Sequence, residues 1–210
     1  MKPGEGNAAL EAVYAAQTPE ELAEAYRQWA ATYDSETLGI GYYLPFQITA
    51  WVARYVPAGE GPLLDAGCGT GLSGPALKAL GYDDIAGLDL SGDMLKLAAS
   101  RGAYAELRQA ELGKTLPWPD SHFRAFFSTG VFTIGHAPAS ALHELARITR
   151  RGGHAIFTVR DVVLESGFLA VNAELERQRK WRAVEESGWF RAFAIAEPEA
   201  LVKTFVFEVL

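Results

Sequence analysis

The sequence predicts an α/β fold in which a mostly parallel sheet of seven strands carries helices on both faces and ends in an antiparallel hairpin. Two observations support this prediction. Short apolar runs alternate with helical patterns between residues 62 and 159, a rhythm that is typical of right-handed crossovers between parallel strands. Two further apolar runs near the C-terminus lie close enough along the chain to pair as antiparallel neighbours.

The composition sets limits on the class of protein. The chain has 210 residues, of which 49% are hydrophobic and 21% charged, which fits one globular domain with a sizeable core and excludes disordered and collagen-like chains. The net charge of -7 disfavours a nucleic-acid partner, because we find no basic stripe to offset repulsion from phosphates. Cys68 is the only cysteine, so no disulfide framework is possible. With neither a targeting segment nor an apolar run that could span a membrane, we expect a soluble cytoplasmic protein.

Residues 1–56 are expected to form a helical lid or extension, packed on a core that residues 57–210 build within the same globular domain. Thr18-Pro19-Glu20-Glu21 is typical of a capping box with proline at the first helical position, and it predicts an amphipathic helix that continues to residue 30. The residues before it are expected to be a loose tail or a short helix. A second helix is expected over 45–55, before a turn-rich segment.

The core elements follow from apolar runs of strand length and from apolar spacing of helical period. The expected parallel strands are 62–66, 85–88, 103–108, 125–128 and 154–159. The expected helices between them are 72–80, 92–100 and 139–150. A long helix over 162–187 is then expected to precede the two strands of the hairpin, 189–195 and 203–210.

The most informative segment is residues 63–74, LLDAGCGTGLSG, where the first strand ends. Its glycines permit positive φ and close approach of the backbone to a ligand, and the helix that follows directs free N–H groups to the same crevice. Leucine at position 72 leaves the dinucleotide pattern G-x-G-x-x-G incomplete, and Asp65 would repel a pyrophosphate. Asp65 suits instead the amino group of a cofactor that carries an amino acid, and Asp89, after the next strand, suits a ribose diol.

LLDAGCGTGLSG and GLDLSGDMLKLA resemble the corresponding segments of class I S-adenosylmethionine (SAM)-dependent methyltransferases, which have a Rossmann-like fold. The likeness continues through AEL, LPWPD and RRGG further along the chain and covers about residues 20–210. YRQWAATYD, before the core, is similar to small-molecule methyltransferases of the Williams-Beuren syndrome region type. The resemblance implies that SAM is the cofactor and that a small-molecule oxygen, nitrogen or carbon nucleophile accepts the methyl group.

The resemblance also implies which residues bind the cofactor. Gly67 and Gly69 would cradle its methionine and ribose part, and Asp65 would lie near its amino group. The full expected set is Tyr33, Asp65, Gly67, Gly69, Gly71, Asp89, Leu90, Met94, Glu111, Leu112 and Thr129. Many relatives have aspartate in place of Glu111, beside the adenine amino group. Other roles stay open, because Asp65 or Asp89 could cap a loop or helix and Met94 could be ordinary core.

The candidate catalytic residue is His136, in the loop after the fourth strand, which leaves the sheet beside the cofactor crevice. Its imidazole could serve as a general base or could orient a substrate, or it could simply bond to the backbone. Tyr26, Trp29 and Tyr33 could close over the cofactor as a lid or form a buried helical stripe. Arg160 could face the crevice or lie in a surface pair. No metal-ligand spacing appears, so no metal is expected.

Two other functions stay open at the level of sequence. A non-catalytic protein could keep the fold and the cofactor as a structural element. A nicotinamide-dependent oxidoreductase is the less favoured alternative, because of Asp65 and of leucine at position 72.

Overall fold

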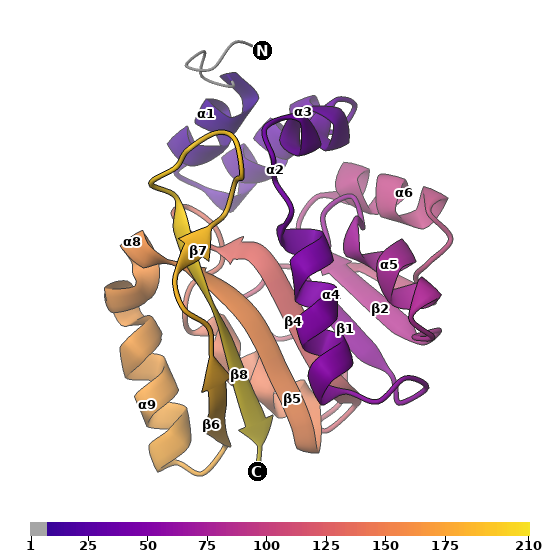
Figure 1. The fold of residues 1–210 in the computed structure, drawn as a ribbon, viewed down its shortest axis with the longest axis vertical. Coiled ribbons are helices and arrows are strands. Elements are labelled where there is room, and N and C mark those ends of the chain that lie inside the picture. The colour runs from indigo at the N-terminus through magenta and orange to yellow at the C-terminus, as the bar shows by residue number, and fades with distance from the viewer. Residues whose placement is uncertain (1–7) are drawn as a thin grey trace.

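The centre of the molecule is one twisted sheet with helices on both faces (Figure 1), and the computed structural model describes residues 8–210 apart from the side chain of Ser166. The strands are β1 Leu63–Ala66, β2 Ile85–Asp89, β3 Glu106–Gln109, β4 Phe123–Phe132, β5 Thr149–Arg160, β6 Trp181–Glu186, β7 Phe190–Arg191 and β8 Leu201–Val209. Their order is β3-β2-β1-β4-β5-β8-β6, with the short β7 paired to β8. Strands β1 to β5 run parallel, and β6, β7 and β8 are antiparallel additions. The predicted fold class is therefore confirmed.

The helices fall into an N-terminal group and a group that alternates with the strands. They are α1 Ala8–Ala15, α2 Pro19–Trp29, α3 Tyr33–Gly39, α4 Leu44–Tyr55, α5 Ser73–Ala79, α6 Gly92–Ser100, α7 Ala141–Ile148, the short α8 Asp161–Val163 and α9 Leu169–Arg177. A π-helical turn, Leu164–Phe168, joins α8 to α9. None of the described helices is long and apolar enough to cross a membrane.

The core forms on both faces of the sheet because successive strand residues point to opposite sides. On β1, Leu63 packs into the cluster that includes α4 and α5, and Leu64 packs into the cluster that includes α7 and α9. On β4, Phe127 and Phe126 divide in the same way, and all four side chains are fully buried. Two-sided burial explains why these strands lack polar alternation. Burial on both faces also holds in place the end of β1, where the glycine-rich loop begins.

The helix expected over 162–187 is wrong in its second half. The helix ends near Arg179, whose φ of 54° is left-handed, and residues 181–186 form β6 instead. Trp181 is fully buried and stacks on Phe207 of β8, with ring centroids 4.4 Å apart. Arg182 pairs with Glu208 across the strands at 2.6 Å. Pairing with β8 therefore overrides the helix-like charge pattern, and β6 replaces 189–195 as the main hairpin strand.

The segment expected as a lid divides between two layers. Helices α1, α2 and α3 lie over the carboxyl ends of the parallel strands (Figure 1), whereas α4 packs on a face of the sheet. The predicted cap is present, because the Glu21 N–H donates to Thr18 Oγ1 at 3.1 Å. The reciprocal bond of the box is shifted by one residue, because Glu21 Oε2 accepts from the Gln17 N–H at 2.8 Å rather than from that of Thr18. Residues 1–7 of the expected lid lie outside the described residues.

Candidate cofactor and active site

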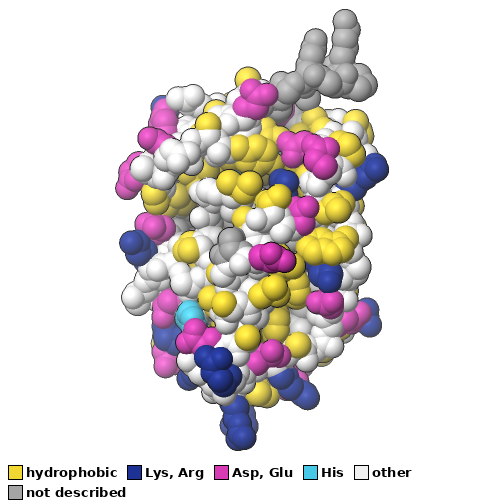
Figure 2. Space-filling view, turned by 90° about the vertical axis from the view of Figure 1, so that its left-hand side faces the viewer, with side chains coloured by type: hydrophobic (Ala, Val, Ile, Leu, Met, Phe, Trp, Pro, Cys, Tyr) yellow, Lys and Arg dark blue, Asp and Glu magenta, His cyan; other side chains and the backbone are white. Residues whose placement is uncertain are grey.

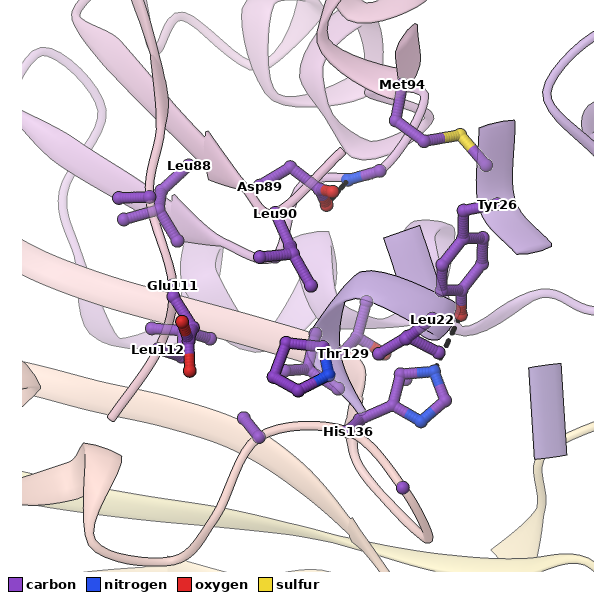
Figure 3. A pocket seen from close by; sticks show the side chains of 18 of the residues that line it. Leu22, Tyr26, Leu88, Asp89, Leu90, Met94, Glu111, Leu112, Thr129 and His136 are labelled. Atoms are coloured by element: carbon purple, nitrogen blue, oxygen red, sulfur yellow. Dashed lines mark hydrogen bonds between the residues drawn. The ribbon is translucent and has the colours of Figure 1, made fainter. Parts of the chain in front are cut away.

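A cavity of about 390 Å³ lies at the carboxyl ends of β1, β2 and β4, under α2 and α3. Figure 3 shows residues from these separate elements converging on it. The strand ends supply a carboxylate and apolar groups on one side, and the loop after β4 supplies His136 on the other. This is the position at which open parallel sheets bind ligands. A cavity of this size suits a small-molecule ligand.

The glycine-rich loop brings backbone rather than side chains to the cavity. Gly67 has a φ of 83°, and its N–H donates to the carbonyl of Leu88 at 2.8 Å. A Cβ on Gly67 would lie 2.2 Å from Val131 Cγ2, so no side chain fits there. A Cβ on Gly69 would meet no protein atom within 4 Å, so the loop leaves open space at that point. The loop is therefore shaped for close approach by a ligand.

Asp89 ends β2 with its carboxylate on the cavity wall (Figure 3). Its Oδ2 accepts a hydrogen bond from the Gly69 N–H at 2.8 Å, and its Oδ1 accepts one from the Ser91 N–H at 2.9 Å. Burial raises the pKa of this carboxyl, and the N–H donors oppose that shift. The side chain that caps α6 is Ser91, which accepts from the Met94 N–H at 3.4 Å. Asp89 is thus held in place by the loop and keeps lone pairs for a ligand.

The wall beside Asp89 is an apolar slot with an acidic end. Leu90, Met94 and Leu112 supply its apolar surface, and Glu111 adds the second carboxylate. Met94 is buried in α6 and still contributes to the wall, so it serves the core and the cavity at once. A flat heteroaromatic ring with an exocyclic amino group matches this combination of apolar surface and hydrogen-bond acceptor.

Two of the expected cofactor residues, Asp65 and Gly71, are not on the cavity wall. The Asp65 carboxylate is buried behind the loop and accepts hydrogen bonds from Ser73 Oγ and, at 2.8 Å, from Tyr104 OH. Burial raises the pKa of Asp65 to about 7. Gly71 packs against the same tyrosine, because a Cβ there would lie 2.8 Å from the Tyr104 ring. The structure brings all the other expected site residues to the cavity.

His136 faces the cavity and bonds to the backbone as well. Its Nδ1 lies 2.8 Å from the Ile134 carbonyl, which can only accept, so Nδ1 carries the proton. Nε2 therefore accepts a hydrogen bond from the Tyr26 hydroxyl at 2.7 Å, the dashed contact in Figure 3. Burial lowers the pKa of His136, which keeps the imidazole neutral near pH 7. A neutral imidazole with this tautomer presents a basic nitrogen to the cavity.

The aromatic residues of α2 and α3 are both a packed stripe and a cover. Trp29 is buried and Tyr33 lies against it, with ring centroids 4.8 Å apart, while Tyr26 and Tyr33 reach the cavity wall.

Polar contacts join α3 to the glycine-rich loop. Thr70 Oγ1 donates to Asp34 Oδ1 at 2.6 Å, and Arg101 pairs with Asp34 and donates to the Thr70 carbonyl.

Tyr26, expected as a lid residue, does line the cavity, but sequence reasoning missed much of the rest of the wall. The additional lining residues are Gln17, Pro19, Leu22 and Tyr42 from the N-terminal segment, and Leu88, Ala110, Gly130, Val131, Gly135, Ala137 and Pro138 from the strand ends and the loops after them. Gly130 is the sequence signal that could have indicated this wall, because the position needs glycine: its φ is 71°, and a Cβ there would lie 2.2 Å from the Tyr42 hydroxyl oxygen. No cluster of described residues has the ligands to hold a metal ion.

Comparisons with known proteins agree with this geometry. Residues 64–157 match the family model described as Methyltransferase domain. Human methyltransferase-like protein 27 is 33% identical over 64% of this chain, and the match spans 56% of that protein, little more than half its length. The phosphatidylethanolamine N-methyltransferase of Cereibacter sphaeroides is 29% identical over 83% of this chain and 82% of its own. A SAM-dependent methyltransferase structure from Thermotoga maritima, described as a possible histamine N-methyltransferase, superposes with a TM-score of 0.61 at 18% identity, covering 87% of this chain and 98% of that one.

The fold and the matched residues define a SAM-dependent methyltransferase domain with a Rossmann-like sheet. Residues 64–157 are similar to class I SAM-dependent methyltransferase domains, whose cofactor is SAM. The cavity fits this cofactor, because a side-chain-free loop, a held carboxylate and an apolar slot with an acidic end lie side by side. The finer resemblance to the Williams-Beuren region type stays a prediction.

Proposed function

We propose that the protein transfers the methyl group of SAM to an oxygen, nitrogen or carbon nucleophile of a small molecule in the cytoplasm. The observation that carries the proposal is one cavity that joins the glycine-rich loop and Asp89 to His136 under a cover of tyrosines. The similarity to methyltransferases indicates SAM as the cofactor, and the partly covered cavity gives a small acceptor a place to meet it with little water present.

The cofactor-side roles follow the geometry of the wall. Asp89 accepts hydrogen bonds from the ribose hydroxyls, and the backbone of Gly67 and Gly69 lies along the methionine part. The adenine ring occupies the slot formed by Leu90, Met94 and Leu112, with its amino group toward Glu111. Tyr33 and Thr129 complete the enclosure. Asp65 lies behind the loop and supports it by accepting a hydrogen bond from Tyr104, and Gly71 leaves room for the ring of that tyrosine.

On the acceptor side, the residues of the chain position the nucleophile and handle its proton. When bound, SAM supplies an electrophilic methyl carbon on a positively charged sulfur. His136 Nε2 takes a proton from an acceptor once the Tyr26 hydroxyl gives up its place at that nitrogen. The rings of Tyr26, Tyr33 and Tyr42 exclude water from the cavity.

Charge supports a small acceptor over a nucleic acid. The net charge is -7, and on the face drawn in Figure 2 the Lys and Arg side chains are interspersed with Asp and Glu rather than joined into one basic surface. A phosphate backbone needs a continuous basic surface. The names of the relatives show different acceptors, since one is a phosphatidylethanolamine N-methyltransferase and another a probable 18S rRNA (guanine-N(7))-methyltransferase. The identity of the acceptor differs between relatives, so it has to be determined for this chain by experiment.

The experiment that tests the proposal uses SAM with an isotopically labelled methyl group. The purified protein is incubated with pools of small metabolites, and with RNA and lipid vesicles as separate arms, and the label is located by mass spectrometry. We expect label in a small molecule together with an equal amount of S-adenosylhomocysteine, and much less product with Asp89→Ala when SAM is limiting. Label found only in RNA or only in lipid would contradict the proposal, as would binding of SAM without product in any arm.

His136 is tested with the acceptor that this screen identifies. The variant His136→Asn keeps a hydrogen-bonding side chain but lacks a basic nitrogen. We expect kcat to fall by about 100-fold, the usual scale for a lost general base, with unchanged affinity for S-adenosylhomocysteine. Turnover equal to that of the unmodified protein would remove His136 as the base.

A further inference from the structure

A second, smaller cavity of about 60 Å³ adjoins the main one. It lies between the N-terminal helices, the loop after β4 and the ends of β5 and β8. Five residues line both cavities, namely Tyr26, Tyr33, Tyr42, Gly130 and His136. The hydrogen bond between Tyr26 and His136 is therefore part of the partition between the two spaces.

Two residues on the wall of the small cavity each carry a buried polar atom that has no hydrogen-bond partner among the described residues. Arg160, at the end of β5, has a side chain that is 15% exposed, and its Nη1 donates to the Tyr14 hydroxyl at 3.3 Å. Its Nε is buried and has no hydrogen-bond partner among the described residues. Thr133 lines the same cavity, and its buried Oγ1 also has no hydrogen-bond partner among residues 8–210. Buried donors without partners are uncommon, and two on one wall indicate a ligand group.

The charges around Arg160 narrow the chemistry of that group. Asp161 Oδ1 lies 3.7 Å from Arg160 Nε, and Glu197 Oε2 lies 3.9 Å from Nη1, so the guanidinium is balanced without its Nε–H being bonded. Tyr14 donates to Glu197 at 3.2 Å and stays a neutral hydroxyl, because burial raises its pKa to about 12. A carboxylate or phosphate ligand would face both acids, and an ammonium ligand would face the guanidinium. An uncharged oxygen is repelled neither by the two carboxylates nor by the guanidinium.

The rest of the wall is apolar and mostly aromatic. Trp29, Tyr33 and Tyr42 line it from the N-terminal segment, and Phe193 closes the opposite side against Tyr42, with ring centroids 5.4 Å apart. Flat or small aliphatic groups are favoured between such rings. The space is small, so only one end of an acceptor fits in it.

We propose that this second cavity is a subsite for the methyl acceptor, and that it binds an uncharged carbonyl, amide or hydroxyl oxygen through the Nε–H of Arg160 and the hydroxyl of Thr133. The proposal rests on the proposed function and names its substrate class, a small apolar molecule with a neutral polar end. His136 and Gly130 line both cavities, so they lie between the oxygen bound in the small cavity and the main cavity. The reacting nucleophile of the acceptor is therefore at its other end, on the His136 side.

The test compares three probes of matched size and different charge, propanamide, propanoate and propylammonium. Each is titrated into ¹⁵N-labelled protein saturated with S-adenosylhomocysteine, and the Nε–H resonance of Arg160 is followed by NMR. Arg160→Lys assigns that resonance and keeps the positive charge while removing the Nε–H. Thr133→Val keeps the shape and removes the hydroxyl. Arg177→Lys, an exposed position on α9, is the matched control.

We expect propanamide to shift the Arg160 resonance and to bind the tightest of the three. Its Kd rises roughly tenfold in Arg160→Lys, the scale of one hydrogen bond to a charged donor, and rises less in Thr133→Val. Neither variant changes the affinity for S-adenosylhomocysteine. Tighter binding of propanoate or propylammonium, or an Arg160 resonance that propanamide does not move, would overturn the subsite. Failure of S-adenosylhomocysteine to bind the unmodified protein would overturn the proposed function instead.

Discussion

The sheet and the N-terminal cover line the same cavity but are held in place by different forces. The glycine-rich loop and Asp89 stand on strands whose side chains are fully buried on both faces, among them Leu64 and Phe126. Helices α1 to α3 bury a smaller cluster, centred on Val13, Leu22 and Trp29, with Leu90 packed against it. The sheet side is therefore fixed by burial of apolar surface, which resists local opening.

Polar contacts add to the apolar packing that attaches the cover to the sheet side. Tyr26 bonds to His136, and Asp34 bonds to Thr70 and Arg101. Contacts of this kind break and reform without disturbing the core. The comparison teaches that the wall formed by the strand ends is fixed by the core, whereas the wall formed by α1 to α3 is held by a smaller set of contacts.

Matched leucine truncations in the two regions should produce the largest difference. Leu64→Ala in β1 is expected to lower the free energy of unfolding by about 2–5 kcal/mol, because it leaves a cavity in the core. Leu22→Ala in α2 is expected to lower it by less than about 1 kcal/mol, because α2 opens locally before the sheet unfolds. Urea unfolding followed by circular dichroism measures both. Equal losses would mean that cover and core unfold as one unit.

Removal of the Asp89 carboxylate should have the next largest effect, on the wall formed by the strand ends. Asp89→Ala is expected to weaken binding of S-adenosylhomocysteine by about 1.5–3 kcal/mol, the range for a hydrogen bond to a charged group. Isothermal titration calorimetry gives the affinity, and Asp93→Ala, an acid paired with Lys96 on α6, is the control. Unchanged affinity in Asp89→Ala would remove the residue from the cofactor site.

The pH dependence of cofactor binding should report on Asp65. Its pKa is raised to about 7, so the carboxyl is largely neutral at pH 6 and ionised at pH 8. An ammonium group favours the ionised form, so the affinity for S-adenosylhomocysteine is expected to rise about tenfold between these values, with release of a proton. Titrations in buffers of different ionisation enthalpy detect that proton. If Asp65→Asn shows the same rise, the effect belongs to another group.

Loosening of the cover should produce the smallest effect on binding. Asp34→Asn weakens the link to Thr70 and Arg101, and amide exchange in α3 is expected to become faster while cofactor affinity falls by about threefold or less. Glu24→Gln, in an exposed pair with Arg27 on the same layer, serves as the control. Exchange in α3 that stays as slow as in the unmodified protein would show that packing alone holds the cover.

The cofactor wall could be predicted from sequence because its signals are local. The glycines at positions 67 and 69 and the acid at position 89 each follow a strand directly, and parallel strand ends meet at one edge. The exception is Asp65, whose strand position is correct but whose carboxylate turns toward Ser73 and Tyr104. Which way a strand-end side chain points depends on packing partners that are distant in sequence.

The wall of the small cavity could be predicted only in part, because its residues come from distant parts of the chain. Arg160, just after a strand, was open to facing the crevice, and it lines this cavity. Tyr14, Thr133 and Arg160 meet only after α1 folds over the ends of β4 and β5. The same reason explains the wrong helix over residues 181–186. Local charge spacing favoured a helix there, whereas burial of Trp181 against Phe207 and pairing with β8 decided the strand.

The most direct test of the cofactor wall is a calorimetric titration of the protein with S-adenosylhomocysteine, accompanied by NMR spectra of the backbone amides. We expect saturable binding of one molecule per chain, with the largest shifts at Gly67, Gly69 and Leu90. The absence of binding heat, or shifts confined to residues away from these positions, would contradict the assignment of this cavity to the cofactor.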